Sequence, residues 1–95
     1  MNVTLLIDGM MSGTGVRDAV NGGYLELGEL GLSDRIVRDI RDWQADYRTA
    51  HIEGHPPEKV AALDKAGLAL MARLQTELPD KKIGYYSDGL LTRLA

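Results

Sequence analysis

The stretch from Ser33 to Gly54 has the spacing of a long amphipathic helix, and it sets the class of fold open to this chain. Ser33 is a favourable N-cap, and Gly54 followed by two prolines ends the helix. At about 100° per residue, one face carries the apolar side chains Ile36, Ile40, Trp43, Tyr47 and Ala50, flanked by Val37, Gln44 and His51. Such a face must be covered by other elements of the same domain.

A second helix is predicted to begin at Pro57 or Glu58 and to end before Pro79. Its core-facing stripe consists of Val60, Leu63, Gly67, Leu70, Leu74 and Leu78. Gly67 costs about 1 kcal/mol relative to alanine in a helix, so we expect close approach of a neighbouring backbone at this position. Because only a short proline-rich turn separates the two helices, they are expected to form an antiparallel hairpin.

Two short apolar runs, Val3–Ile7 and Lys82–Ser87, are predicted to be strands. The long helical connection between them favours parallel pairing. Tyr24–Leu27 either adds a third strand or leaves an edge open to a partner. After Asp88, a last short helix is expected through Leu90, Leu91 and Leu94. The predicted fold is α/β (or α+β), a two- to three-stranded sheet packed on a helical hairpin, in the order β-loop-α-α-β-α.

Composition limits the functions open to the chain. Its 95 residues predict a single domain, and a net charge of −3 with a pI near 5.2 argues against general nucleic-acid binding. Cysteine is absent, which excludes disulfides and thiolate chemistry. Neither a signal peptide nor a membrane span is predicted, so we expect a cytoplasmic protein, monomeric or weakly dimeric, that does not bind a membrane.

One edge of the first predicted helix is acidic. Its carboxylates are Asp39, Asp42, Asp46 and Glu53, which we call the acidic strip, whereas Arg38, Arg41 and Arg48 lie on the far side. Charges on a helix are commonly a solvated face. Like charges gathered beside Trp43 nevertheless resemble a binding surface for a cationic partner. Trp43 and Tyr47 themselves are expected in the core, because they lie on the apolar face.

Seven of the eleven glycines lie between Gly9 and Gly31. The segment Ser12-Gly13-Thr14-Gly15 follows a strand that ends at Asp8, where glycine-rich loops can bind phosphate. It matches neither GxGxxG nor GxxxxGK[ST], so an ordered structural loop is the favoured interpretation. We expect one helical turn within Val16–Val20, and an ion pair between Arg17 and Asp18. The alternative is a small enzyme or nucleotide-binding module built on Asp8, Ser12, Thr14, Arg17 and Asp18.

His51 and His55 are separated by four residues, with Glu53 between them. A helical metal site would require regular helix through Gly54, where the helix is expected to end, so no metal site or cofactor is predicted. The sequence contains no GxSxG motif, and no set of serine, histidine and aspartate has a recognisable catalytic spacing. An enzyme is therefore not the favoured interpretation.

Three segments together resemble a known family. They are SGTGVRDAVNGGYLELGELGLS, a helix with the pattern IxxWxxxY, and GLALMARLQTELPDKKIGYYSDGL. In this combination the chain is similar to small bacterial immunity proteins of polymorphic toxin and contact-dependent growth inhibition systems. The resemblance implies a cytoplasmic, non-catalytic protein that binds one cognate toxin domain and covers its active site. It implies no contact residues, so the expectation that the acidic strip and Trp43 meet a cationic cleft, such as that of a nuclease, comes from charge geometry alone.

Overall fold

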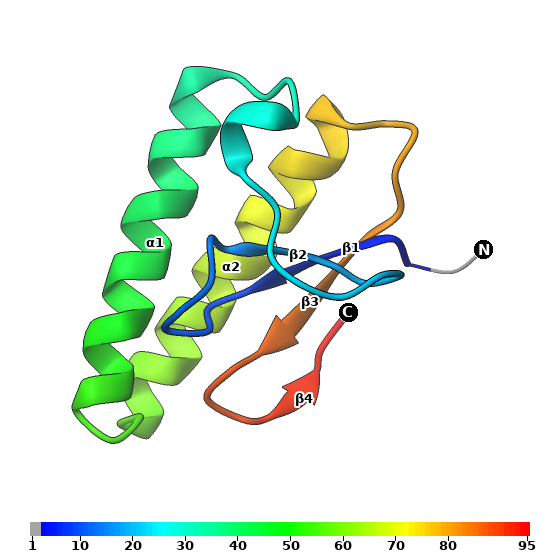
Figure 1. The fold of residues 1–95 in the computed structure, drawn as a ribbon. Coiled ribbons are helices and arrows are strands. Elements are labelled where there is room, and N and C mark those ends of the chain that lie inside the picture. Colours follow the sequence, from blue (N-terminus) through cyan, green and yellow to red (C-terminus); the bar gives the residue numbers. More distant parts are fainter. Residues whose placement is uncertain (1–2) are drawn as a thin grey trace.

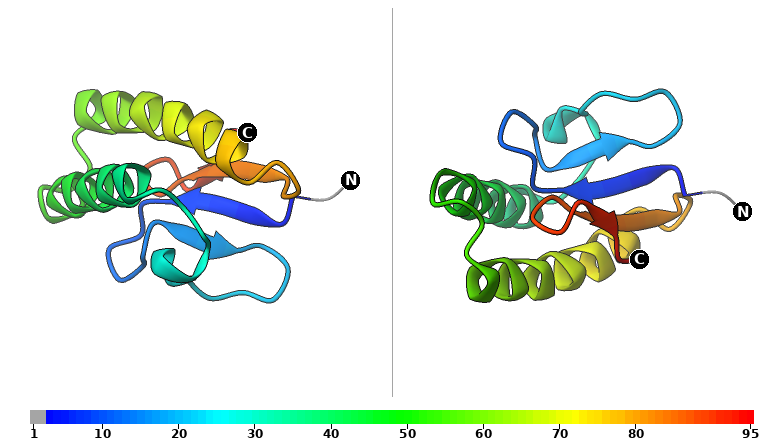
Figure 2. Two further views of the ribbon diagram at one scale, coloured as in Figure 1. Left: turned by 90° about the horizontal axis from the view of Figure 1, so that it is seen from above. Right: turned by 90° about the horizontal axis from the view of Figure 1, so that it is seen from below.

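The computed structural model describes residues 3–95, which form an α+β domain with two α-helices and a four-stranded mixed sheet. Figures 1 and 2 show both helices packed on the same face of the sheet. The elements are β1 (Leu5–Asp8), β2 (Val16–Asp18), the 3-10 helix η1 (Leu27–Glu29), α1 (Asp34–Ile52), α2 (Pro57–Glu77), β3 (Ile83–Ser87) and β4 (Thr92–Arg93). The predicted helical hairpin and mixed composition are confirmed, whereas the predicted two- to three-stranded sheet is wrong.

The sheet has the strand order β2-β1-β3-β4. The central pair, β1 and β3, is parallel, with Leu5 opposite Ile83 and Asp8 opposite Tyr86. The predicted parallel pairing is therefore confirmed. The helical hairpin lies in the chain between these two strands and provides the long crossover that parallel strands require. Strands β2 and β4 are antiparallel to their neighbours and form the two edges. Both edge strands are short, with three and two residues, so little unpaired backbone is open to a partner strand.

Three local predictions fail at the edges of the sheet. Val16–Asp18 is a strand rather than a helical turn, because it pairs with Leu5–Ile7 of β1. The segment Tyr24–Leu27 adds no strand and contributes a single bridge from Tyr24 to Arg17. The expected helix after Asp88 is a turn followed by β4. The turn includes a left-handed residue, Leu91, at φ 55°, and the predicted apolar positions are exposed: Leu90, Leu91 and Leu94.

Helix α1 begins and ends as the sequence predicts. The Ser33 hydroxyl accepts a hydrogen bond from the Ile36 N–H, and Glu77 of α2 accepts bonds from both the N–H and the hydroxyl of Ser33. These bonds to Ser33 hold the pKa of the Glu77 carboxyl below its ordinary value. At the other end, Gly54 adopts φ 84°, a conformation that favours glycine. One hydrogen-bonded capping residue therefore joins the start of α1 to the end of α2.

The core lies between the sheet and the two helices. Trp43 and Tyr47 are 4% and 0% exposed, which confirms their predicted place in it. The other principal members are Leu5, Ile7, Val16, Leu27, Ile36, Ile40, Leu70, Leu74, Ile83 and Tyr85. Because neighbouring strand residues alternate between faces, Leu6 and Asp8 lie on the face of the sheet opposite the helices.

Gly67 allows an aromatic ring to pack directly against α2. A β-carbon at this position would lie 2.3 Å from Cε2 of Tyr85. The predicted close approach therefore exists, but it is made by a buried tyrosine ring of β3 rather than by a backbone. A side chain at residue 67 would displace that ring from the centre of the core.

We expect Gly67→Ala to lower the free energy of unfolding by about 1–2 kcal/mol. Helix propensity alone favours alanine by about 1 kcal/mol, but the clash with Tyr85 costs more than that gain. Urea unfolding followed by circular dichroism measures the change. Ala66→Gly, at an exposed position of α2, is the matched control and should lose about 1 kcal/mol through propensity. A Gly67→Ala variant more stable than the native chain would contradict the packing described.

Candidate functional site

The acidic strip borders the groove between α1 and α2, on the side of the hairpin away from the sheet. Asp39, Asp42 and Asp46 line this groove from α1. Its floor and far wall are Leu63, Ala66, Ala69, Leu70 and Arg73 of α2 together with Trp43. Towards the hairpin turn, a second hollow between the helices is lined in part by Asp46 and Glu53. The structure thus places the four predicted carboxylates along two neighbouring, partly apolar hollows, which share Asp46 and Leu63.

Two of the four carboxylates are already matched by cations of α2. Asp39 accepts a hydrogen bond from the Arg73 guanidinium at 2.8 Å, and Glu53 pairs with Lys59. Asp42 and Asp46 are exposed, and neither forms an ion pair with any residue between 3 and 95. Since they are one helical turn apart, their charges add over a short distance. The unbalanced negative charge of the groove is therefore concentrated at these two residues.

Trp43 closes the base of the groove and is not an exposed anchor. Its indole N–H donates to the Leu63 carbonyl of α2 at 2.8 Å. The ring packs edge-on against Tyr47 and Tyr85, with centroids at 5.5 and 6.0 Å. Trp43 is thus a core residue that joins the two helices, and only the carboxylates beside it face the solvent.

The glycine-rich loop is an ordered part of the fold. The Thr14 hydroxyl donates to the Leu25 carbonyl at 2.6 Å, and the ring of Tyr24 packs against Gly13. Gly15 adopts φ 101°, and a β-carbon there would lie 2.6 Å from Cγ2 of Ile40. Ser12 is exposed. The Thr14 hydroxyl and the Gly13 N–H, which donates to the Met10 carbonyl at 3.0 Å, are both used within the protein and are not free to bind a phosphate.

The predicted ion pair between Arg17 and Asp18 does not form. Arg17 extends instead to the buried Asp8 carboxylate, 3.4 Å away. Asp18 accepts hydrogen bonds from the backbone of Val20 and Asn21, and the bond from Asn21 is the main cause of its lowered pKa. Neighbouring residues of a strand point to opposite faces, which explains why adjacent Arg17 and Asp18 find different partners.

Asp8 is held by groups from three segments. It accepts hydrogen bonds from the Met10 N–H at 2.9 Å and from the Tyr24 hydroxyl at 3.0 Å, and Arg17 supplies the opposite charge. Burial and the nearby Asp8 carboxylate raise the pKa of Tyr24. The Arg17 guanidinium also lies over the ring of Tyr86, 5.2 Å from its centroid. Asp8 therefore fastens the glycine-rich loop to the sheet.

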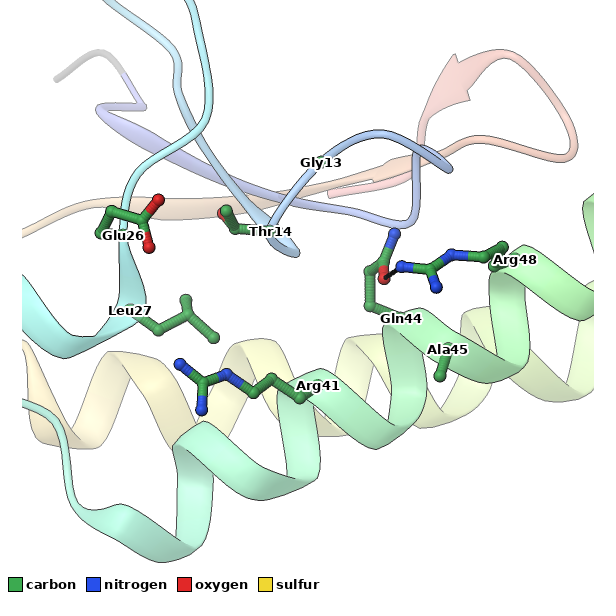
Figure 3. Close-up of a pocket in the computed structure, with 8 residues that line it drawn as sticks. All are labelled: Gly13, Thr14, Glu26, Leu27, Arg41, Gln44, Ala45 and Arg48. Atoms are coloured by element: carbon green, nitrogen blue, oxygen red, sulfur yellow. Dashed lines mark hydrogen bonds between the residues drawn. The ribbon is translucent and has the colours of Figure 1, made fainter.

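A cavity of about 240 Å³ lies between this loop and α1 (Figure 3). It is lined by Gly13, Thr14, Glu26, Leu27, Arg41, Gln44, Ala45 and Arg48. Gln44 is fixed because its amide donates to the Met10 carbonyl at 2.7 Å and its carbonyl accepts from Arg48 at 3.1 Å. Arg41 makes no ion pair within the described part of the chain. The sequence indicates the loop as a possible anion site. It does not indicate that Arg41 and Arg48 of α1 line the same cavity.

A buried polar cluster surrounds Asp64, and the sequence does not predict it. This carboxylate of α2 is 5% exposed and accepts hydrogen bonds from three hydroxyls: Tyr47 at 2.9 Å, Tyr85 at 2.6 Å and Ser87 at 2.7 Å. In the sequence, the only indication of this cluster is that Asp64 lies between Val60 and Gly67 on the predicted apolar stripe of α2. Because each donor is engaged, the cluster stabilises the fold and offers no free group for chemistry.

The cluster changes the acidity of its tyrosines. Burial is the main cause that raises the pKa of Tyr47 to about 12. Burial and the hydrogen bond to Asp64 raise the pKa of Tyr85 by more than that of Tyr47. The Tyr47 hydroxyl also accepts a hydrogen bond from the Gly89 N–H at 2.9 Å. These hydroxyls must stay protonated to donate to Asp64.

Comparisons of the chain with protein-family models, with curated protein sequences and with solved structures find no match. No helix among residues 3–95 has the length and apolar character needed to cross a membrane.

We expect the fold to lose stability as the pH rises from about 10 towards 12. The pKa of Tyr47 is raised above its ordinary value of 10.0, so the folded state binds its proton more tightly than the unfolded chain does. Its contribution is complete below pH 10 and disappears as the pH passes through the raised value. Urea unfolding over this alkaline range gives the slope. Tyr47→Phe, which has no phenol to ionise, should be less stable at pH 8 but show a shallower alkaline decline; an equal slope would contradict the assignment.

Proposed function

We propose that this chain is a non-catalytic binding protein that meets a cationic surface of a partner protein through the α1–α2 groove. One observation carries the proposal: Asp42 and Asp46 are exposed and have no ion-pair partner among the described residues, and they border a groove with an apolar floor. Such a surface combines charge complementarity with apolar contact area, the two features of a specific protein interface.

The two parts of the groove have separate roles in this proposal. Exposed carboxylates at the rim speed the encounter with a cationic partner and orient it. Apolar contacts on the floor, at Leu63, Ala66 and Ala69, set how long the complex lasts. Asp39 and Glu53 contribute less, because Arg73 and Lys59 already balance their charges.

The resemblance to immunity proteins supplies the class of partner. We propose that the partner is a bacterial toxin domain with a cationic substrate cleft, such as a nuclease, and that the chain neutralises it in the cytoplasm. An acidic groove is suited to such a cleft because it occupies the phosphate subsites without offering a bond to cleave. Co-expression of the chain with the C-terminal domain encoded by the adjacent upstream gene tests this step. A stable complex and protection of the host cell are expected, and failure of both would refute the toxin assignment.

We expect the double variant Asp42→Lys, Asp46→Lys to weaken the complex by at least about tenfold, chiefly through slower association. Both side chains are exposed and unpaired in the described structure, so the fold and its thermal midpoint should change little. Surface plasmon resonance at low and high salt measures the rates, and the difference between native and variant should shrink at high salt.

The matched control for this charge reversal is Glu29→Lys, Asp80→Lys, which changes the net charge equally at exposed positions outside the groove. It should retain most of the association rate. Ala66→Arg fills the floor of the groove and should shorten the lifetime of the complex, whereas Ala61→Arg, exposed elsewhere on α2, should not. If the groove variants bind like their controls, the interface lies on another face.

A second candidate function has one observation in its favour: Arg41 and Arg48 face the glycine-rich loop across the cavity of Figure 3. Two guanidinium groups that line one cavity with Thr14 suit a phosphorylated ligand better than the loop alone does. In this alternative the chain is a small nucleotide- or phosphate-binding module.

We expect any stabilisation by a nucleotide or phosphosugar to disappear in the variant Arg41→Ala, Arg48→Ala. Differential scanning fluorimetry with a panel of such compounds provides the measurement. Arg38→Ala is the control, because Arg38 lies on α1 but does not line the cavity. If no compound in the panel raises the native midpoint, this second function is refuted and the groove proposal is unaffected.

A further inference from the structure

Three potential metal ligands meet where the α1–α2 turn approaches the β3–β4 turn, at one end of the molecule (Figure 1). His51 Nδ1 lies 3.1 Å from His55 Nε2. Asp88 Oδ2 lies 3.7 Å from the first of these nitrogens and 3.5 Å from the second. Two imidazoles and a carboxylate, separated by up to 37 positions in the sequence from His51 to Asp88, therefore point at one shared space.

The backbone at the end of α1 brings the two histidines together. Gly54 and His55 both adopt left-handed conformations, with φ 84° and 56°, and the His55 N–H donates to the Ala50 carbonyl at 2.8 Å. This reversal folds His55 back beside His51 although the helix has ended. The two rings therefore meet without regular helix through Gly54, which the sequence had indicated a metal pair would need.

Hydrogen bonds within the protein do not satisfy this cluster. Asp88 Oδ2 is buried and accepts no hydrogen bond from the described residues. With both rings neutral, a single proton shared by His51 and His55 leaves the carboxylate oxygen unmatched. A bound cation instead accepts a lone pair from all three atoms at once.

The spacing of the three atoms selects the coordination geometry. Ligand atoms about 2.0–2.1 Å from a tetrahedral zinc ion lie about 3.3–3.4 Å from one another. The observed separations of 3.1, 3.5 and 3.7 Å lie around that value. Adjacent ligands of an octahedral magnesium ion would be about 2.8–3.0 Å apart, and magnesium prefers oxygen ligands. Imidazole nitrogen suits a first-row transition metal.

We propose that His51, His55 and Asp88 form a site for a divalent transition-metal ion of the zinc type, with tetrahedral geometry and one position open. The side chain of His51 is 42% exposed, so solvent reaches this ligand, and the fourth position would take a water molecule or a donor from a partner. The ion would join the turn between the helices to the turn that follows β3. The site is separate from the α1–α2 groove and from the arginine cavity. A negative result for metal binding would therefore leave the two proposed functions unaffected.

Zinc titration of the native chain, expressed without a polyhistidine tag and freed of metal with a chelator, tests the proposal. Isothermal calorimetry should show one zinc ion bound per chain, and the thermal midpoint should rise with zinc concentration. Cobalt(II) added in place of zinc should give the intense visible absorption of tetrahedral coordination. Absence of saturable zinc binding, or the weak absorption of octahedral cobalt, would overturn the site as described.

Single substitutions test each ligand. Asp88→Asn, His51→Gln and His55→Asn should each lower the affinity for zinc by at least about tenfold. Asparagine tolerates the left-handed backbone at residue 55, so that variant should remain folded by circular dichroism. Asp80→Asn, exposed in the loop before β3, is the control and should bind zinc like the native chain. Equal zinc affinity in the three ligand variants and the control would assign the ion to other residues and overturn the proposal.

Discussion

The Asp64 carboxyl group is the interaction on which the arrangement of the elements depends. A buried carboxyl group is costly unless its oxygens accept hydrogen bonds, and here the three donors come from α1 and β3. Helix α2 therefore cannot slide along either neighbour without breaking these buried hydrogen bonds. Gly67, one turn further along α2, leaves the space that lets the Tyr85 ring reach the carboxyl group. The packing of the Tyr85 ring against α2 therefore depends on both Gly67 and Asp64.

The same cluster positions the turn after β3. The Tyr47 hydroxyl accepts from the Gly89 N–H, and the Ser87 hydroxyl accepts from the Leu90 N–H at 3.1 Å. Asp88 lies between these anchored residues, so its direction towards the end of α1 follows from hydrogen bonds in the core. The proposed metal site thus takes one ligand from a turn that the Asp64 cluster holds and two from the capped end of α1. Ligands held by independent contacts need little reorganisation to bind an ion.

The sequence predicted the long-range architecture better than the edges. Ser33, Gly54 and Pro57 mark helix ends through local backbone chemistry, so both helices and the parallel pairing they impose were accessible. Edge strands depend on tertiary pairing: β2 forms only because β1 is beside it, and Leu90, Leu91 and Leu94 suggested a helix although no core faces them. The acidic strip was predictable from helical spacing. The Asp64 cluster and the meeting of Asp88 with the histidines were not, because they join segments distant in sequence.

Helix α1 separates its charges by direction. Asp42 and Asp46 lie along the groove with α2 and form no ion pair within residues 3–95, whereas Arg41 and Arg48 line the cavity beside the glycine-rich loop. Helix α1 therefore carries negative charge on one side and positive charge on another, a separation that the net charge of −3 for the whole chain does not reveal. In the proposed function, a cationic partner would be attracted to the groove and repelled from the arginine side, so the helix would orient the partner as well as attract it. Asp39 and Glu53 form exposed ion pairs with Arg73 and Lys59 of α2, which leaves Asp42 and Asp46 as the carboxylates of the strip that have no ion-pair partner among the described residues.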